Sequence, residues 1–160
     1  MGTGKSSTGR VLARKLGYDF IDSDTMIEMQ QGLSVADIFQ QFGEITFREL
    51  EAKAAEELSQ REGLVIATGG KMMLDEKNAA TLGRTGQVFC LVAKPEELIK
   101  RLSSKTAQQR RPLLHDVDLE QHIRQLLGDR GPEYAKFQQI DTSGKKPYQI
   151  ANKIIRLMRK

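Results

Sequence analysis

The sequence predicts an α/β fold in which a mostly parallel sheet lies between two layers of helices. Short apolar runs rich in valine and isoleucine alternate along the 160 residues with longer segments of helical period. The apolar runs lack the alternation of apolar and polar residues that is typical of a sheet with one face in water. Strands of this kind are covered on both faces, so we expect helices on both sides of the sheet.

This alternation sets the order of the expected elements. Helices are expected at residues 5–16, 34–42, 44–60, 75–82, 95–102, 118–128 and 147–159. Strands are expected at residues 18–22, 64–68, 88–92 and 139–141. No repeat and no linker rich in proline or glycine interrupts this order, so residues 1–160 are expected to form a single domain.

Capping residues and apolar spacing support individual helices. Gly17 suits the left-handed position that follows the first helix. Ser34 suits the cap of the second helix, with Asp37 in its first turn near the positive end of the helix dipole. Pro95 suits the first position of the helix at residues 95–102. Between residues 44 and 60, apolar residues recur at the spacing of a buried stripe: Phe47, Leu50, Ala54 and Leu58.

Composition and charge exclude several classes of protein. The 25 basic and 21 acidic residues give a net charge of +4, but the two signs are mixed along the chain. Aromatic residues make up only 6% and there is no tryptophan, so we expect no base-stacking surface for nucleic acid. Cys90 is the single cysteine, which excludes an internal disulfide, and its apolar neighbours predict a core position.

The sequence also shows none of the signals of a membrane or secreted protein. The longest apolar run, residues 88–93, is much shorter than the roughly 18 residues that a membrane span requires. No charged segment followed by an apolar one opens the chain, as a secretory signal would. We therefore expect a cytoplasmic protein that has no membrane partner and works as a monomer.

The chain opens on a glycine-rich segment that is typical of the end of a phosphate-binding loop, G-x-x-x-x-G-K-[ST]. Gly2 and Gly4 would let backbone N–H groups point at phosphate oxygens, and the helix that follows would add its dipole. Lys5 would reach the β- and γ-phosphates, and the Ser6 hydroxyl would bind Mg²⁺. The alternative is a flexible glycine-rich start. The first glycine of the motif, and the strand that delivers the loop, would lie before Met1.

Two acidic residues, Asp22 and Asp24, follow the first expected strand. If the extended conformation persists, their side chains project on the same side. One carboxylate could then hold Mg²⁺ through water while the other meets the hydroxyl group of an acceptor. Helix capping is the alternative for such a pair.

The order of these motifs resembles shikimate kinase, a P-loop kinase that phosphorylates the 3-hydroxyl of shikimate with ATP in aromatic amino-acid biosynthesis. The resemblance runs through nearly the whole chain. It is carried by the segments at residues 2–7 (Gly-Thr-Gly-Lys-Ser-Ser), 22–24 (Asp-Ser-Asp), 37–39, 43–44, 47–51 (Phe-Arg-Glu-Leu-Glu), 67–70 (Ala-Thr-Gly-Gly), 111–114 (Arg-Pro-Leu-Leu) and 130–134 (Arg-Gly-Pro-Glu-Tyr). It implies a three-layer P-loop NTPase-type fold with a mobile lid, which corresponds to the polar, basic segment at residues 103–117.

For the acceptor, the resemblance implies a site built from three charged residues and two glycines. Asp24 would bind the attacking hydroxyl and could accept its proton. Arg48 and Arg130 would bind the shikimate carboxylate, since a guanidinium can meet a carboxylate through two parallel N–H bonds. Gly69 and Gly70 would let the backbone approach the substrate ring.

For the nucleotide, the resemblance implies ATP contacts from Gly2, Thr3, Gly4, Lys5, Ser6, Ser7 and Arg111. Arg111, in the lid, would offset charge on the γ-phosphoryl group in the transition state. The implied cofactor is Mg²⁺, held by Ser6 and Asp22. The loop at residues 142–147 corresponds to the adenine-side loop. The basic residue next to the adenine stays open among Arg101, Lys105 and Arg110.

Several of these residues have a simpler structural interpretation. Arg48 and Glu51 are spaced i, i+3 on one helix and could form an exposed ion pair. Arg111 could be a solvated loop residue, and Arg130 could be a cation favoured near a helix end.

The glycine pair after the second expected strand could likewise form an ordinary turn. The family usually has a third glycine where this chain has Lys71. Lys71 either disturbs the backbone or adds a cation near an anionic substrate.

Two other functions remain open at this level. One is another small-molecule P-loop kinase, such as a gluconate kinase or a nucleoside monophosphate kinase. The other is a non-catalytic binding module that resembles shikimate kinase.

Overall fold

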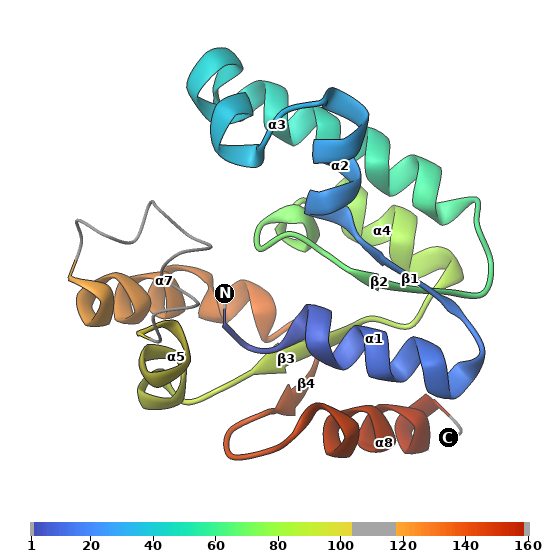
Figure 1. Cartoon of the computed structure of the whole chain (residues 1–160), viewed down its shortest axis with the longest axis vertical. Helices are drawn as coiled ribbons and strands as arrows, with labels where there is room; N and C mark the ends of the chain where they lie inside the picture. Colours follow the sequence, from blue (N-terminus) through green and yellow to red (C-terminus); the bar gives the residue numbers. More distant parts are fainter. Residues whose placement is uncertain (1, 104–117, 159–160) are drawn as a thin grey trace.

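The computed structural model describes residues 2–103 and 118–158 (Figure 1). The helices are α1 (Lys5–Leu16), α2 (Ser23–Gln31), α3 (Val35–Ser59), the 3₁₀ helix η1 (Met72–Leu74), α4 (Glu76–Thr85), α5 (Pro95–Leu102), α7 (Leu119–Tyr134) and α8 (Pro147–Met158). The strands are β1 (Asp19–Asp22), β2 (Leu64–Ala67), β3 (Phe89–Val92) and β4 (Gln138–Asp141). Within the described ranges, no helix has both the length and the apolar character needed to cross a membrane.

The strands form parallel pairs, as predicted. β1 pairs with β2, and β3 pairs with β4; over the described residues these are separate two-stranded sheets. The last residues of paired strands lie opposite each other: Asp22 faces Ala67, and Val92 faces Asp141. The loops that follow paired strands therefore start at the same edge, where ligands bind in open α/β sheets.

Helices cover both faces of the β1–β2 pair, which confirms the predicted layers (Figure 1). Ile66 of β2 packs on a core built by α2, α3, η1 and α4: Ile27, Ile38, Phe47, Ala54, Ala55, Leu58, Met72 and Leu82. Val65 points to the opposite face because side chains alternate along a strand. It packs on a second core built by α1, β4 and α8: Leu12, Ile140, Ile150, Ala151 and Ile154.

The predicted caps are present. Gly17 has φ 70° at the end of α1, and Pro95 is the first residue of α5. The Ser34 hydroxyl accepts a hydrogen bond from the N–H of Asp37, whose carboxylate accepts one from the N–H of Ser34. This reciprocal capping box satisfies two backbone donors at the start of α3. Cys90 is half-buried, whereas the sequence predicted a core position.

Three helices differ from the sequence prediction. α2 was not predicted, because it starts directly at the end of β1 with no turn residue between them. The helices predicted at residues 34–42 and 44–60 are two parts of α3, which bends at Gly43 with φ 82° and ψ 173°. α7 continues to Tyr134, past the predicted end at residue 128, with Pro132 inside it. The missing proline N–H costs one helical hydrogen bond but does not stop the helix near its end.

Candidate active site

The candidate site lies at the carboxyl ends of β1 and β2. After β1 the chain turns directly into α2, and after β2 it continues through Gly69 and Gly70 to η1. The backbone N–H of Gly69 donates a buried hydrogen bond of 2.9 Å to the hydroxyl of Ser23. The strand register and this hydrogen bond together fix the loop after β2 against the first turn of α2.

The glycine-rich segment at the start of the chain adopts the backbone conformation that its sequence predicts. Gly2 has φ 72° and Gly4 has φ 88°, which are left-handed conformations that favour glycine. Gly4 is the residue before α1, and α1 has no acidic residue in its first turn. A side-chain Cβ at Gly2 would lie 3.2 Å from Cγ of Leu102, so the loop also packs closely on α5. The N–H groups at the start of α1 are therefore in a position to bind an anion.

Ser6 links this loop to the end of β1. Its hydroxyl donates a hydrogen bond of 2.6 Å to a carboxylate oxygen of Asp22. Asp22 stands at the cap position of α2 but makes no side-chain capping hydrogen bond, so the capping alternative is wrong for this residue. The extended geometry assumed for Asp22 and Asp24 is also wrong, because Asp24 lies in the first turn of α2.

Asp24 is enclosed by the loop after β2. Its Oδ1 is buried without a hydrogen-bond partner among the described residues. A Cβ added to Gly69 would lie 2.5 Å from this oxygen and 2.8 Å from Oε1 of Glu51. Burial, and then the charge of Asp22, raise the pKa of Asp24, while Lys5 and Arg48 oppose the rise. The two cations therefore act on Asp24 from the phosphate-loop side and from the α3 side.

Glu51 is a site residue that the sequence analysis treated only as the partner of an exposed ion pair. The Arg48–Glu51 ion pair is present, but the Glu51 side chain is only 2% exposed. Burial raises the pKa of Glu51, and Arg48 partly offsets this. The guanidinium of Arg48 also lies 5.2 Å from the ring centroid of Phe47. The missed signal was position: Glu51 is one turn after Phe47, on the stripe of α3 that faces the core.

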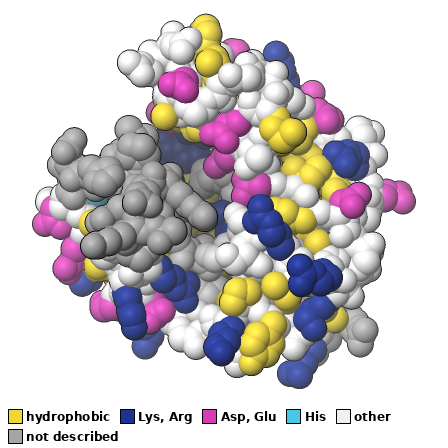
Figure 2. Space-filling model, viewed as in Figure 1, with side chains coloured by type: hydrophobic (Ala, Val, Ile, Leu, Met, Phe, Trp, Pro, Cys, Tyr) yellow, Lys and Arg dark blue, Asp and Glu magenta, His cyan; other side chains and the backbone are white. Residues whose placement is uncertain are grey.

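α7 reaches the same loop from the other side. A terminal nitrogen of Arg130 lies 3.2 Å from where a Cβ of Gly70 would be, and the hydroxyl of Tyr134 donates to the carbonyl of Gly70. The structure therefore brings Arg130 to Gly70, whereas Arg48 is linked to Gly69 only through Glu51. Gly69 is buried, and Gly70 lies in a turn that is partly buried. Tyr134 was part of a quoted motif but had no predicted role. Figure 2 shows basic and acidic side chains gathered at a recess between the α2–α3 part and the rest of the molecule.

Arg111 lies outside the described residues, as does the lid from residue 104 to 117. Arg101, one of the residues considered for the adenine side, joins the phosphate loop to the loop after β4. Its guanidinium donates a hydrogen bond of 3.3 Å to the carbonyl of Gly2 and one of 2.8 Å to the carbonyl of Thr142.

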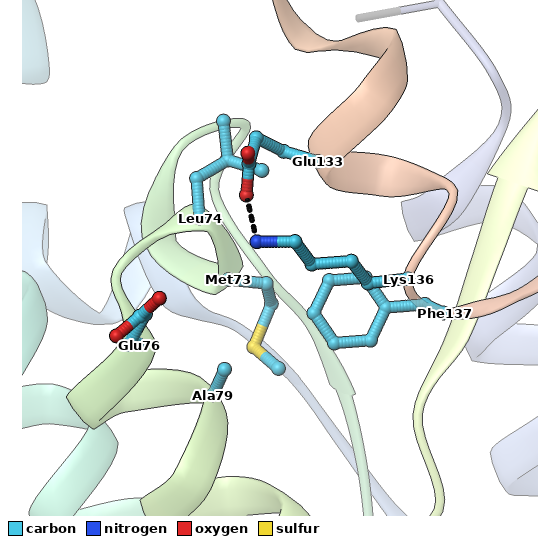
Figure 3. Close-up of a pocket in the computed structure, with 7 residues that line it drawn as sticks. All are labelled: Met73, Leu74, Glu76, Ala79, Glu133, Lys136 and Phe137. Atoms are coloured by element: carbon cyan, nitrogen blue, oxygen red, sulfur yellow. Dashed lines mark hydrogen bonds and ion pairs between the residues drawn. The ribbon is translucent and has the colours of Figure 1, made fainter.

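A separate pocket of about 210 Å³ lies between η1, α4 and the end of α7 (Figure 3). Its wall contains one ion pair, Lys136–Glu133, at 2.5 Å. The other lining residues are Met73, Leu74, Glu76, Ala79 and Phe137. None of the predicted site residues lines this pocket.

Comparison with known proteins identifies the family. The family model for shikimate kinase matches residues 1–159. The chain belongs to the shikimate kinase family. A shikimate kinase from Thermodesulfovibrio yellowstonii is 41% identical over 157 residues, which cover 98% of this chain and 89% of that protein. A shikimate kinase from Caldanaerobacter subterraneus is 41% identical over 158 residues, covering 98% of this chain and 90% of that protein.

Solved structures of shikimate kinases share the fold. The Acinetobacter baumannii enzyme in complex with shikimate has a TM-score of 0.89 at 36% identity, covering 99% of this chain and 88% of that one. The Bacteroides thetaiotaomicron enzyme has a TM-score of 0.88 at 31% identity, covering 100% of this chain and 94% of that one. The predicted resemblance and the three-layer α/β fold are confirmed.

Proposed function

We propose that this chain transfers the γ-phosphoryl group of ATP to the 3-hydroxyl of shikimate. The observation that carries the proposal is the meeting of two unlike sites at the ends of β1 and β2. On one side lies an anion-binding loop that begins α1. On the other lies Asp24 with one buried carboxylate oxygen, together with Arg130 beside Gly70 and Arg48 paired with Glu51.

On the nucleotide side, the backbone from Gly2 to Ser7 would hold the phosphates of ATP. Lys5 would contact the β- and γ-phosphates and offset charge that develops during transfer. The resemblance to shikimate kinase implies the same task for Arg111, where closure of the expected lid would exclude water from the γ-phosphoryl group.

The implied Mg²⁺ fits the oxygen atoms beside the loop. The hydroxyl of Ser6 and the carboxylate of Asp22 are 2.6 Å apart and are hard oxygen ligands of the kind that Mg²⁺ prefers. Over the described residues, no group of three His, Cys, Asp or Glu could form a cage of protein ligands. Mg²⁺ usually binds through one or two protein oxygens, substrate phosphates and water, which agrees with this pair. When bound, Mg²⁺ would neutralise charge on the phosphates.

On the acceptor side, Arg48 and Arg130 would bind the carboxylate of shikimate and set the ring against the backbone of Gly69 and Gly70. Asp24 would accept a hydrogen bond from the 3-hydroxyl. That oxygen attacks the γ-phosphorus, the bond from the γ-phosphorus to the β,γ-bridging oxygen breaks, and ADP leaves with the bonding electrons. The hydroxyl proton passes to Asp24 and then to solvent. A loose transition state demands positioning more than proton abstraction, so Asp24 acts mainly by orienting the hydroxyl.

The assembly and cellular location belong to the same proposal. One chain supplies both the phosphate loop and the acceptor residues, which supports a monomeric enzyme with ATP and shikimate as its substrates. We place the enzyme in the cytoplasm, where both substrates would be available.

An acceptor panel tests the proposal. ATP consumption is measured with Mg²⁺ and either shikimate, gluconate or a nucleoside monophosphate. Rapid consumption of ATP is expected with shikimate and with neither of the other two acceptors. Preference for gluconate or a nucleotide would contradict the proposal, and so would calorimetric binding of Mg·ATP without turnover of any acceptor, which is the result expected of a binding module.

A further inference from the structure

Lys71 is the residue that stands where the family usually has a third glycine. It pairs with Glu44, which also pairs with Arg48. Its ammonium group lies 2.8 Å from Oε1 of Glu44, the first residue after the bend in α3. The same oxygen accepts a hydrogen bond from Nε of Arg48 at 3.2 Å and forms an ion pair with Nη2 of Arg48 at 3.1 Å. The third nitrogen of Arg48, Nη1, pairs with Glu51. One carboxylate oxygen is thus shared by a lysine and an arginine.

The backbone at Lys71 is unstrained. Its φ of −105° and ψ of −11° are accessible to any L-residue, and it stands before the first residue of η1. Lys71 is therefore accommodated without backbone strain, and the added cation is the feature to explain.

Glu44 occupies the part of Arg48 that a substrate carboxylate needs. Nε and Nη2 form one edge of the guanidinium, and a carboxylate binds such an edge through two parallel N–H bonds. In the structure Glu44 meets this edge, while Glu51 is buried against Nη1. Because Glu44 is 51% exposed, it can leave the edge at little desolvation cost, whereas Glu51 cannot.

We propose that Lys71 is a positioning residue that holds Glu44 when Glu44 leaves Arg48, so that Arg48 is released to the substrate carboxylate. This inference rests on the proposed function. Lys71 is 42% exposed and already contacts Glu44 at 2.8 Å, so it can keep Glu44 as the substrate enters. The carboxylate of Glu44 then loses Arg48 but keeps Lys71, so it always has a partner. Without Lys71, Glu44 would have only Arg48 to pair with and would compete more strongly with the substrate.

A double-mutant cycle between Lys71 and Glu44 tests this mechanism. Lys71→Met should raise the KM for shikimate about three-fold, the size expected for a partly exposed ion pair, with kcat and the KM for ATP unchanged. Lys71→Arg should restore the parent value because it keeps the cation. In a Glu44→Gln background the competitor is absent, so Lys71→Met should have no effect. Lys77→Met removes an exposed lysine from the first turn of α4 and is the matched control.

The outcomes separate this inference from its rivals. If Lys71→Met raises the KM equally with and without Glu44, Lys71 attracts the substrate directly and the proposed role through Glu44 is wrong. An unchanged KM, or equal changes for ATP and shikimate, also overturns it. Calorimetric titration with shikimate should show the same pattern in the dissociation constants of these variants, measured without turnover. If the unmutated protein neither binds nor phosphorylates shikimate, the proposed function is refuted as well. If it is active but Lys71→Met leaves the KM for shikimate unchanged in both backgrounds, only the role of Lys71 is refuted.

Discussion

The side chain of Asp24 shows how burial prepares a functional group. One carboxylate oxygen has no hydrogen-bond partner in the described part of the chain, and the neighbouring Asp22 adds a like charge. Such a group costs stability, because a buried oxygen that loses water gains nothing in return. A substrate hydroxyl would supply the missing partner.

Replacing Asp24 by Asn should therefore stabilise the protein while it lowers activity. The folded pKa of Asp24 lies above its ordinary value of 3.8, so the folded state binds this proton more tightly than the unfolded state. The stability that this group contributes falls as the pH rises from 3.8 through the folded pKa. At pH 7, Asp24→Asn should raise the free energy of unfolding by about 1 kcal/mol and lower kcat by about 10²-fold. Denaturant titrations should show the gain shrinking as the pH falls towards 3.8; a gain independent of pH would contradict the argument.

Arg130 offers a second prediction for a single residue. Arg130→Ala should raise the KM for shikimate about 10- to 100-fold, which corresponds to the loss of hydrogen bonds to a charged group. Steady-state kinetics with both substrates should show little change in the KM for ATP. Arg124→Ala is the control, because Arg124 lies on the same helix but pairs with the exposed Glu120. Equal effects of the two substitutions would exclude Arg130 from the carboxylate site.

A third prediction concerns Lys5, which we propose to contact the β- and γ-phosphates of ATP. Lys5→Ala should lower kcat by about 10³-fold, because the charge that develops on the phosphates would lose the stabilising charge of this lysine. Shikimate binding, measured by calorimetry without nucleotide, should remain measurable. Undiminished turnover of the variant would remove Lys5 from the phosphate site.

Individual site residues were predictable where their type matches a local motif. The glycines and Ser6 of the phosphate loop follow from a short contiguous pattern, and their left-handed backbone agrees with it. The burial of Glu51 could have been inferred from its place one turn after Phe47 on the core-facing stripe of α3. The contact of Tyr134 was not predictable, because its partner is distant in sequence. Tyr134 donates to Gly70, which is 64 positions earlier in the chain.

At the scale of elements, the loop after β2 depends on close contact with α2 and α3. Gly69 leaves no space for a side chain, since Asp24 and Glu51 both lie within 3 Å of an added Cβ. The hydrogen bond from Gly69 to Ser23 fixes the backbone at the same point. The loop can therefore not retreat without moving the start of α2.

Two glycine substitutions test this packing. Gly69→Ala should displace the carboxylates of Asp24 and Glu51 and lower kcat/KM for shikimate by about 10²-fold, as expected for a misplacement of the order of 1 Å. Gly83→Ala is the matched control in α4, where nothing lies within 4 Å of an added Cβ. It should leave activity unchanged and stabilise the protein by about 1 kcal/mol, because alanine is the better helix former. Full activity of Gly69→Ala would show that the loop is not tightly packed.

Element boundaries were predictable where a capping residue marks them. Gly17, Ser34 and Pro95 mark the ends of their helices, and all three positions are confirmed. α2 follows β1 without a side-chain cap to mark its start. The glycines and proline near the end of α7 predicted an earlier end, but the helix continues to Tyr134. Local propensity is a weak guide where tertiary contacts decide the conformation.

At the scale of the whole molecule, the fold brings together groups from α1, α2, α3, the loop after β2 and α7. The parallel order of strands and helices was predictable, because apolar runs and helical segments alternate along the sequence. The pairing of the strands was not, since register depends on contacts between distant segments. The position of the site followed from the general rule that ligands bind at the carboxyl ends of parallel strands.

The position of the transferred phosphoryl group tests the central claim most directly. The purified chain is incubated with Mg·ATP and shikimate, and the product is examined by phosphorus and proton NMR. We expect one ADP for each product molecule, with the phosphorus coupled to the proton on carbon 3 of the ring. Release of inorganic phosphate with unchanged shikimate, or coupling to a proton at another ring position, would contradict the arrangement of Asp24 and the two arginines around the acceptor.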